Sequence, residues 1–528
     1  MRELWAAINA NAATRGDESA LLVFDTALET AYTWKQLQRA VRRLIWRLRQ
    51  DRVRVLALAA DNVPAWVIAD IACGVAGITL LPLPGFFAAG QLRHALDTVP
   101  VDALLHDATL PDAVVAAQSP EPASSQTLLG LHYRRLERSE QALAARADSL
   151  PGGTSKITFT SGSTGTPRGA CLSAAHLEAV ASSIVAATQS CQITRHLCVL
   201  PLATLLENVA GVHAPLRRGA AVVLVPQQRL GFNGASGFSL PAFLDVLAHC
   251  RPQSLILIPQ LLEALVMSAA SGWKLPDSLR FVAVGGASVN PLLLERAWQF
   301  GIPAFEGYGL SECGSVVSLN TPGQRRNGSL GRPLPHVRVA IHEGEIQVFG
   351  PRFLGYAGDK ASWLSADDSA PLATGDLGYQ DNDGYLHFDG RRKNLLVSSF
   401  GRNISPEWVE TQLAASPCIA QSIVFGDSRP YCVALVQARH ARISDEDIDA
   451  SIAAINAALP DYARVQRWAR LNEPLLRGSG LETDLLTSNG RPRRAQIAQR
   501  FAATLEALYS ASNDDTHTPR KETMPHVL

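Results

Sequence analysis

The chain has 528 residues, of which 47% are hydrophobic and 18% are charged. This composition is that of an ordinary globular protein, and the length predicts two or three domains. The 48 basic and 48 acidic residues give a net charge of zero. That balance excludes the global positive field by which proteins attract nucleic acid or an anionic membrane.

The sequence shows neither targeting nor zinc-binding patterns. The N-terminus has no basic region followed by an apolar core, so we expect no signal peptide. The longest apolar stretch, residues 67–83, contains Asp70 and Pro82 and is too short for a transmembrane segment. The eight cysteines are scattered without zinc spacing, and the simplest location is a reducing cytoplasm.

The first 390 residues alternate between strand-like and helix-like segments. Such alternation predicts a large α/β domain with a mostly parallel sheet, in which ligands bind at the carboxyl ends of strands. Asn290 is expected to cap one helix, with Pro291 in the first turn. The expected strands are 53–60, 254–259 and 281–286, and the expected helices are 64–75, 260–270 and 291–300.

The pattern changes near residue 394, where the sequence predicts a second, compact α+β domain of about 115 residues. Ser405 is expected to cap a helix that begins with Pro406. The last residues are polar and without periodicity, which predicts a disordered tail. The expected divisions are 1–392, 393–509 and 510–528, with small-domain strands at 395–399, 419–425 and 431–437 and helices at 405–415 and 443–458.

A loop rich in glycine and hydroxyl side chains follows the strand-like residues 157–160. Residues 160–169 contain three glycines, five hydroxyl side chains and one cation, Arg168. Glycine lets backbone N–H groups approach an anion closely, and hydroxyls add donors, so the loop suits a polyphosphate. It is not a Walker A loop, because Gly-Lys-Ser/Thr does not occur in the chain. A flexible Ser/Gly linker is the alternative interpretation.

Three further motifs follow in the chain, at Tyr308–Glu312, Thr374–Asp376 and Gly390–Lys393. Together with residues 157–169, they resemble the motifs of the adenylate-forming superfamily, which includes acyl-CoA synthetases, peptide-synthetase adenylation domains and luciferases. The resemblance covers roughly residues 10–505. It implies a large N-terminal domain, a small mobile C-terminal domain, and activation of a carboxylate by ATP and Mg²⁺ through an acyl-adenylate.

The resemblance assigns the ATP phosphates to the glycine-rich loop and to the residues around Ser311. Arg168 stands where the family's loop usually has lysine, and it keeps the positive charge. Ser311 is implied to bind the α-phosphate, and Glu312 is implied to hold Mg²⁺. The residues implied to wrap the β- and γ-phosphates are Thr160, Ser161, Gly162, Ser163, Thr164 and Gly165.

The same resemblance assigns the nucleoside. Tyr308 offers a flat face for adenine, and Asp376 and Arg391 are implied to bind the ribose hydroxyls. Lys393, two positions after Arg391, is implied to be a hinge about which the small domain rotates between adenylation and thioester formation. The residues implied to surround the base are Gly285, Gly286, Ala287, Glu306 and Gly307.

One departure from the family's pattern lies near the C-terminus. Residues 485–494 resemble the last motif, in which a lysine bridges the substrate carboxylate and the α-phosphate, but Arg491 takes the place of that lysine. The chain has 42 arginines and six lysines, so the replacement is less surprising here. Three interpretations stay open: Arg491 substitutes for lysine, adenylation is slow or redirected, or Arg491 is a surface residue and adenylation is lost.

Residues 201–208 resemble the segment that lines the acyl pocket in this superfamily. Long-chain acyl-CoA synthetases often have a histidine and an aromatic residue at the positions of Thr204 and Leu206. The aspartate with which amino-acid-activating relatives bind the α-amine is missing. The apolar side chains suit a fatty or aromatic tail and would equally suit a core; they are Leu205, Leu206, Val209 and Val212.

The leading hypothesis is an acyl-CoA synthetase that uses ATP, Mg²⁺ and CoA on a small fatty or aryl carboxylic acid. Gly401 would let a pantetheine arm pass close to the backbone. One alternative transfers the acyl group to the phosphopantetheine of an acyl carrier protein. Two others are a nucleotide- or acyl-binding protein impaired in adenylation by Arg491, and an enzyme that closes a hydroxy acid into a ring.

Overall fold

The structure of the protein is a computed structural model. It describes residues 1–510 except 109, 111–125, 137–148, 161–166, 234–236, 365–369, 401, 472–474, 476–484 and 487–491. The chain divides into two compact units. Unit 1 comprises residues 1–374, 380–387 and 479–482, and unit 2 comprises residues 375–379, 388–478 and 483–528. The domain boundary expected at residue 393 stays a prediction.

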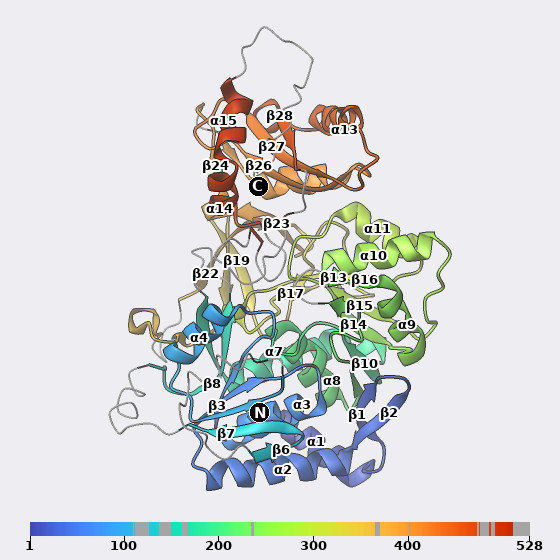
Figure 1. The fold of residues 1–528 in the computed structure, drawn as a ribbon, viewed down its shortest axis with the longest axis vertical. Coiled ribbons are helices and arrows are strands. Elements are labelled where there is room, and N and C mark those ends of the chain that lie inside the picture. The colour runs from blue at the N-terminus through green and yellow to red at the C-terminus, as the bar shows by residue number, and fades with distance from the viewer. Residues whose placement is uncertain are drawn as a thin grey trace. The chain divides into compact units, whose positions relative to one another are not determined.

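Unit 1 contains an eight-stranded sheet in the order β21-β9-β8-β4-β3-β5-β7-β6. Its centre is parallel, because β3 runs in the same direction as β4 and β5, and β4 in the same direction as β8. The helices α1, α2 and α3 pack together, and α3 contacts β3, β4 and β8 (Figure 1). The strands are β3 Val55–Ala59, β4 Thr79–Pro82, β5 Ala103–His106, β6 Gln126–Leu128, β7 Leu131–Arg135, β8 Thr154–Thr160, β9 Arg168–Ser173 and β21 Gly355–Tyr356, and the helices are α1 Arg2–Thr14, α2 Trp34–Gln50, α3 Pro64–Ala76 and α4 Ala89–Thr98.

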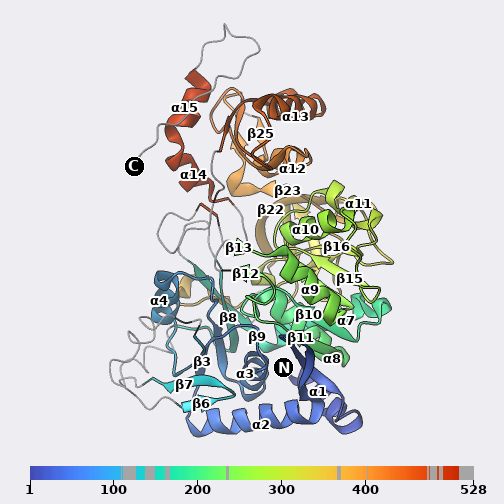
Figure 2. The same cartoon turned by 45° about the vertical axis from the view of Figure 1, so that its right-hand side comes forward.

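A nine-stranded sheet in the same unit has the order β18-β17-β16-β15-β14-β10-β11-β1-β2. The six strands from β16 to β1 are parallel. The helices α9, α10 and α11 lie along this sheet (Figure 2). The strands are β1 Ser19–Phe24, β2 Leu28–Thr33, β10 Arg195–Cys198, β11 Ala221–Leu224, β14 Ser254–Leu257, β15 Phe281–Val284, β16 Ala304–Tyr308, β17 Ser318–Leu319 and β18 Arg332–Pro333, and the helices are α9 Leu240–Cys250, α10 Pro259–Ala270 and α11 Pro291–Gln299.

A layer of helices contacts both sheets. Helix α7 (Ala174–Ala187) packs on β8 and β9, while α8 (Ala214–Arg218) packs on β11. Between them runs η3 (Glu207–His213), a π-helix that contacts β10 and β14. π-Helices are rare in proteins, and those that occur often lie at functional sites. The segment expected to line an acyl pocket, residues 201–208, runs directly into this π-helix.

Local sequence explains why the predicted elements form. The Asn290 side chain accepts a hydrogen bond of 2.9 Å from the Leu292 backbone N–H, and Pro291 begins α11. The predicted strands and helices of the large domain match β3, α3, β14, α10, β15 and α11 within three residues at each end. The α/β fold class is therefore confirmed. In the part of the chain that the structure describes, no helix is both long and apolar enough to cross a bilayer.

Unit 2 is built on the three-stranded sheet β26-β27-β28. Ser405 accepts a hydrogen bond of 3.3 Å from the Trp408 backbone N–H and caps α12, as predicted. Helix α15 ends at Ser510, and the remainder of the predicted tail, 511–528, lies outside the described residues. The elements are β24 Leu396–Val397, β25 Asn403–Ile404, α12 Pro406–Leu413, β26 Ile419–Phe425, β27 Cys432–Ala438, α13 Asp445–Ala458, β28 Val465–Arg470, α14 Arg494–Arg500 and α15 Ala502–Ser510.

Two strands carry the chain from one unit to the other. They are β22 (Leu372–Gln380) and β23 (Leu386–Arg391), the last members of a four-stranded sheet in the order β19-β20-β22-β23. The turn between these strands belongs to unit 1. The remaining strands are β12 Phe232–Asn233, β13 Gly237–Phe238, β19 Arg338–His342 and β20 Glu345–Phe349.

Candidate active site

The two ends of the glycine-rich segment are held side by side by a strand pair. β8 ends at Thr160 and β9 begins at Arg168, and these two residues are opposite each other in the antiparallel register. The position of both ends is therefore fixed by the sheet. The residues predicted to wrap phosphate between them, Ser161, Gly162, Ser163, Thr164 and Gly165, lie outside the described residues.

Arg168 contacts two residues of the segment that begins with β21. Its guanidinium carbon lies 3.6 Å from the centre of the Tyr356 ring, which is a close cation–π contact. Its Nη2 atom lies 2.7 Å from Oδ2 of Asp359. The Arg168 side chain keeps 48% of its surface exposed, so these contacts orient the guanidinium and leave it accessible to a ligand.

Tyr356 also contacts Glu312. The Tyr356 hydroxyl donates a hydrogen bond of 2.7 Å to Oε1 of Glu312. Burial and the nearby Glu312 carboxylate raise the pKa of this hydroxyl, so it stays a proton donor at neutral pH. Glu312 lies in the short 3₁₀ helix η4 (Ser311–Cys313), which also carries Ser311. One tyrosine thus has its ring on Arg168 and its hydroxyl on Glu312.

Neither Tyr356 nor Asp359 was predicted from the sequence. Tyr356 pairs with Ala170 of β9, a residue far away in the chain, and no local pattern indicates that pairing. The local signal is the preceding Gly355, which has φ of +128° and where a Cβ would lie 2.8 Å from Trp363. A glycine beside an aromatic residue is too common in sequences to indicate a site without the fold.

The residues predicted on the adenine side lie at the carboxyl ends of two parallel strands of the nine-stranded sheet, β15 and β16. β15 and β16 are parallel with Val284 opposite Glu306, so the residues that follow both strands emerge together. Gly286 has φ of +85°, a conformation that favours glycine. A Cβ at Gly285 would lie 3.5 Å from the carbonyl oxygen of Gly307. The structure therefore brings together Gly286, Ala287, Glu306, Gly307 and Tyr308.

The Glu306 side chain supports these strand ends from inside. Glu306 is buried, and its Oε1 accepts a hydrogen bond of 3.2 Å from the Val289 backbone N–H. Burial raises the pKa of the Glu306 carboxyl to about 8, so the group is mostly protonated at neutral pH. Glu306 therefore fixes the chain that follows the Gly286 turn.

In unit 2, Asp376 and Arg391 form an ion pair. Nε of Arg391 lies 2.9 Å from Oδ1 of Asp376. Asp376 is buried and Arg391 is partly exposed. The pair orients both side chains that are predicted to bind the ribose. Lys393, the predicted hinge, follows in the 3₁₀ helix η6 (Arg392–Asn394).

Two predicted residues of unit 2, Gly401 and Arg491, lie outside the described residues. The chain on both sides of residues 487–491 is described. Leu486 and Pro492 form an antiparallel bridge. The two residues that flank 487–491 therefore lie next to each other. The same is true of Thr160 and Arg168, which flank residues 161–166 in unit 1.

Arg494, two residues after Pro492, is bound within unit 2. This arginine begins α14 and keeps 15% of its side-chain surface exposed. Its Nη2 atom donates to Oε2 of Glu410 at 2.5 Å, and its Nη1 atom donates to the Val424 carbonyl at 2.8 Å. Arg494 is a structural cation of unit 2.

The segment predicted to line the acyl pocket is partly core. Thr204 Oγ1 donates a hydrogen bond of 2.7 Å to the backbone carbonyl three residues earlier. Val209 and Val212 are fully buried in two hydrophobic clusters, which agrees with the core interpretation for these two. Leu205 is buried in the same cluster as Val209, whereas Leu206 is partly buried and packs against that cluster. Leu206 is therefore the one of these four positions that is accessible for an acyl-pocket role.

A buried group of His196, Cys198 and Glu207 brings three potential metal ligands within 4.8 Å of one another. Glu207 Oε1 lies 3.2 Å from His196 Nε2, and its Oε2 accepts a 2.8 Å bond from the Leu200 backbone N–H. Burial raises the pKa of the Cys198 thiol, which disfavours the thiolate that binds metals. This group is a hydrogen-bonded part of the core.

Comparison with known proteins decides the family. Residues 8–352 match the family model described as AMP-binding enzyme, and residues 393–513 match the AMP-binding enzyme C-terminal domain. The chain belongs to the AMP-binding enzyme family. The superfamily predicted from the four motifs is confirmed, and so is the prediction that the chain is an enzyme.

The relatives are CoA ligases by name. An indoleacetate–CoA ligase of Aromatoleum aromaticum is 29% identical over 435 residues, 75% of this chain and 81% of the relative. A long-chain-fatty-acid–CoA ligase of Mycobacterium bovis is 25% identical over 549 residues, 87% of this chain and 88% of the relative. The o-succinylbenzoate CoA synthetase of Bacillus subtilis, solved with its acyl-adenylate intermediate, has the same fold, with a TM-score of 0.73 at 22% identity over 93% of this chain and 97% of that chain.

Proposed function

We propose that the protein activates a small carboxylic acid with ATP and transfers the acyl group to the thiol of CoA. In the first half-reaction a carboxylate oxygen attacks the α-phosphorus of ATP, and pyrophosphate leaves. In the second, the thiol sulfur attacks the acyl carbonyl carbon, the thiol loses its proton, and AMP leaves. The observation that carries the proposal is the contact of Tyr356 with both Arg168 and Glu312.

Attack on the α-phosphorus requires that the negative charge on the phosphates be neutralised. Arg168 supplies a fixed positive charge at the end of the glycine-rich segment, and a guanidinium can bind two phosphate oxygens at once. We assign the α-phosphate to Ser311. The β- and γ-phosphates are assigned to Thr160, Ser161, Gly162, Ser163, Thr164 and Gly165.

Glu312 fits a Mg²⁺ ion, because Mg²⁺ prefers oxygen ligands and is usually held by one or two carboxylates together with substrate phosphates. The protonated Tyr356 hydroxyl binds Oε1 of Glu312 as a neutral donor. The hydroxyl therefore orients the carboxylate without adding a charge of its own. A Mg²⁺ ion bound there would offset phosphate charge, and Tyr356 would orient its ligand.

The nucleoside is assigned from the sequence motifs. Tyr308, with Gly286, Ala287, Glu306 and Gly307, would bind the adenine. Asp376 and Arg391 would bind the ribose hydroxyls, since their mutual ion pair already orients them. Lys393 would be the hinge about which the small domain rotates between the adenylation and thioester-forming half-reactions.

Arg491 is proposed to substitute for the family's lysine. A guanidinium stays charged at all working pH values and can bridge two oxyanions, which is the task that the lysine performs. The arginine-rich composition of the chain supports this interpretation. Arg491 would then contact the substrate carboxylate and the α-phosphate during adenylation.

A fatty or aryl acid is the proposed substrate, and CoA the proposed acceptor. The apolar side chain of Leu206, which is partly buried, supports an apolar tail. The names of the relatives support the same classes, since one acts on indoleacetate and another on long-chain fatty acids. Both relatives are named as CoA ligases, which supports CoA over a carrier protein.

The test is acid-dependent pyrophosphate release with ATP and Mg²⁺, measured across fatty, aryl and amino acids with and without CoA. We expect release with a fatty or aryl class, an increase on adding CoA, and an acyl-CoA mass in the product. A carrier-protein thioester would show that the acceptor is a carrier protein and not CoA. A cyclised product would show that the acyl group is transferred to a hydroxyl of the substrate itself. A protein that binds ATP but releases no pyrophosphate with any acid would contradict the proposal.

A further inference from the structure

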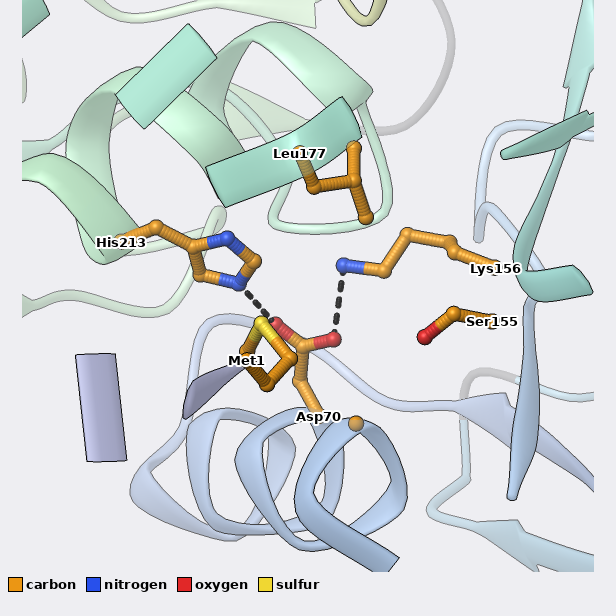
Figure 3. Close-up of a pocket in the computed structure, with 7 residues that line it drawn as sticks. Met1, Asp70, Ser155, Lys156, Leu177 and His213 are labelled. Carbon is orange, nitrogen blue, oxygen red and sulfur yellow. Dashed lines mark hydrogen bonds and ion pairs between the residues drawn. The ribbon is translucent and has the colours of Figure 1, made fainter. Parts of the chain in front are cut away.

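A buried lysine lies on the strand that leads to the glycine-rich segment. Lys156 is in the middle of β8, and only 3% of its surface is exposed. Its Nζ atom lies 2.6 Å from Oδ1 of Asp70, which is buried on α3. His213 Nε2 lies 2.6 Å from the other oxygen of the same carboxylate. Figure 3 shows Lys156 and His213 reaching Asp70 from opposite sides.

The same network includes the π-helix η3. Asn208 donates a 2.8 Å hydrogen bond to Oδ2 of Asp70 and accepts one from Lys156. His213, the last residue of η3, binds Asp70 as well. The π-helix is therefore bound at both of its ends to α3 and, at Asn208, to β8. We call these four residues, Asp70, Lys156, Asn208 and His213, the buried clamp.

The opposite side of η3 is held by a second set of polar contacts. Glu207, its first residue, is fully buried and binds His196 of β10 and the Leu200 backbone N–H. The Leu200 and Leu202 backbone groups in turn bind the Asn62 side chain at 3.0 and 2.9 Å. The start of the acyl-side segment and the π-helix thus have positions set by buried polar groups.

Hydrophobic packing alone does not require such a clamp. Removing charges from water costs free energy, and replacing a buried ion pair by apolar residues is often neutral or stabilising. Lysine is also scarce in this chain, with six lysines against 42 arginines. A buried polar network instead specifies one geometry, because any shift of the partners leaves a charge unpaired.

We propose that Lys156 and Asp70 are specificity-determining positioning residues. They fix the π-helix η3, which follows the segment predicted to line the acyl pocket (residues 201–208), relative to β8, the strand that leads to the glycine-rich loop. The inference rests on the proposed adenylation. The acid must place its carboxylate at the α-phosphate while its tail lies against the acyl-side segment. A fixed spacing between β8 and η3 then limits which acids reach the phosphate in the right position.

The test uses the double variant Lys156→Met/Asp70→Asn in the full chain. It removes both charges together, and the new amide oxygen at position 70 can still accept from both His213 and Asn208. We expect the preference between two acids that differ in length or ring size, measured as the ratio of their kcat/KM values, to fall by about fivefold or more. The ATP dissociation constant should stay within about twofold, a range that small changes in electrostatics and packing cover.

A matched control is Tyr133→Phe. It removes a buried hydroxyl that donates a 2.7 Å bond to Asp51, on β7 of the same sheet and four strands away from β8. This variant should leave the acid ratio unchanged even if it melts at a lower temperature. An unchanged ratio in the double variant, or an equal change in Tyr133→Phe, would overturn the inference.

Amide hydrogen exchange tests whether β8 and η3 are coupled, and it does not require an active enzyme. We expect exchange to rise together in 154–160 and 207–213 in the double variant, and in Tyr133→Phe only around 131–135. Unaltered exchange in 207–213 would overturn the inference, whether or not wild type adenylates an acid. If wild type is inactive but exchange rises in both segments of the double variant, only the proposed function is refuted. The single variant Lys156→Arg provides a second test if the double variant fails to fold, because it keeps the charge and should retain more of the acid preference than a neutral residue.

Discussion

Two segments of the molecule carry an arginine where their resemblance to the family's motifs implies a lysine, and their surroundings differ. In unit 1, Arg168 is the first residue of β9, and its side chain contacts Tyr356 and Asp359. In unit 2, Arg491 lies in the sequence between Leu486 and Pro492, which form an antiparallel bridge. A different arginine, Arg494, follows Pro492 by two residues and is bound to Glu410 and Val424.

The difference shows that the two replacements pose different chemical problems. Arg168 is already oriented by a ring and a carboxylate before any phosphate arrives. The longer, planar guanidinium suits this stacked position better than an ammonium would. Arg491 lies outside the described residues, between two residues, Leu486 and Pro492, that pair with each other. Substitutions in unit 1 should therefore disturb phosphate and metal binding, and substitutions at Arg491 should disturb the adenylation step alone.

The largest effect is expected for Asp376→Ala. Losing this buried carboxylate removes the acceptor for two ribose hydroxyls and leaves Arg391 without its ion-pair partner. We expect ATP affinity, measured by calorimetry, to fall by about a hundredfold or more, since hydrogen bonds to a charged group contribute about 1.5–3 kcal/mol each. Asp383→Ala, an exposed acid in the turn before β23, is the control. Unchanged ATP affinity in Asp376→Ala would remove the ribose assignment.

Tyr356→Phe tests the connection within unit 1. It keeps the ring on which Arg168 is stacked and removes the hydroxyl that binds Glu312. The Mg²⁺ concentration that gives half-maximal adenylation should rise about tenfold, the effect of losing one hydrogen bond to a charged group. Tyr356→Leu removes the ring as well and should also weaken pyrophosphate binding. Equal Mg²⁺ dependence in wild type and Tyr356→Phe would show that the tyrosine does not orient Glu312.

Arg491→Lys makes the complementary change in unit 2. If Arg491 is a tuned substitute, restoring lysine should change the single-turnover rate of acyl-adenylate formation severalfold and leave ATP affinity unaltered. The exposed Arg500 of α14 offers a matched control in Arg500→Lys. A rate that matches wild type would make Arg491 a bystander.

A separate effect is expected on the pH dependence of the protein's stability. The pKa of Glu306 rises from 4.5 to about 8 on burial, so the folded protein holds a proton there that the unfolded chain releases. The stabilising contribution is complete below pH 4.5 and is lost as the pH rises through about 8, at roughly 1.4 kcal/mol per pH unit. The melting temperature of wild type should therefore fall relative to Glu306→Gln between pH 5 and 8. A constant difference would contradict the buried, protonated carboxyl.

Local patterns in the sequence were enough to predict the elements and their caps. Asn290 and Ser405 cap their helices as expected, because a cap is decided by residues within one turn. The strands β3, β14, β15 and β26 were predicted for the same reason, as short apolar runs between turns. The motifs around Arg168 and Tyr308 located the candidate site because their spacing is local too.

The rest depends on contacts between distant segments. Tyr356 meets Arg168 and Glu312 only because β21 pairs with β9. The buried clamp joins Asp70 and Lys156, which belong to α3 and β8 and have no sequence pattern in common. The π-helix could not be predicted either, because Glu207 and His213 are fixed by partners on other strands and helices.

The central claim is that unit 1 holds ATP phosphates and Mg²⁺ between Arg168 and Glu312 for attack by a carboxylate. The most direct measurement is acid-dependent exchange of labelled pyrophosphate into ATP, with wild type and Glu312→Gln side by side across Mg²⁺ concentrations. We predict exchange in wild type that requires both acid and Mg²⁺, and a loss of about a hundredfold or more in the variant. Exchange of equal rate in both proteins, or none in wild type with bound ATP, would contradict the account.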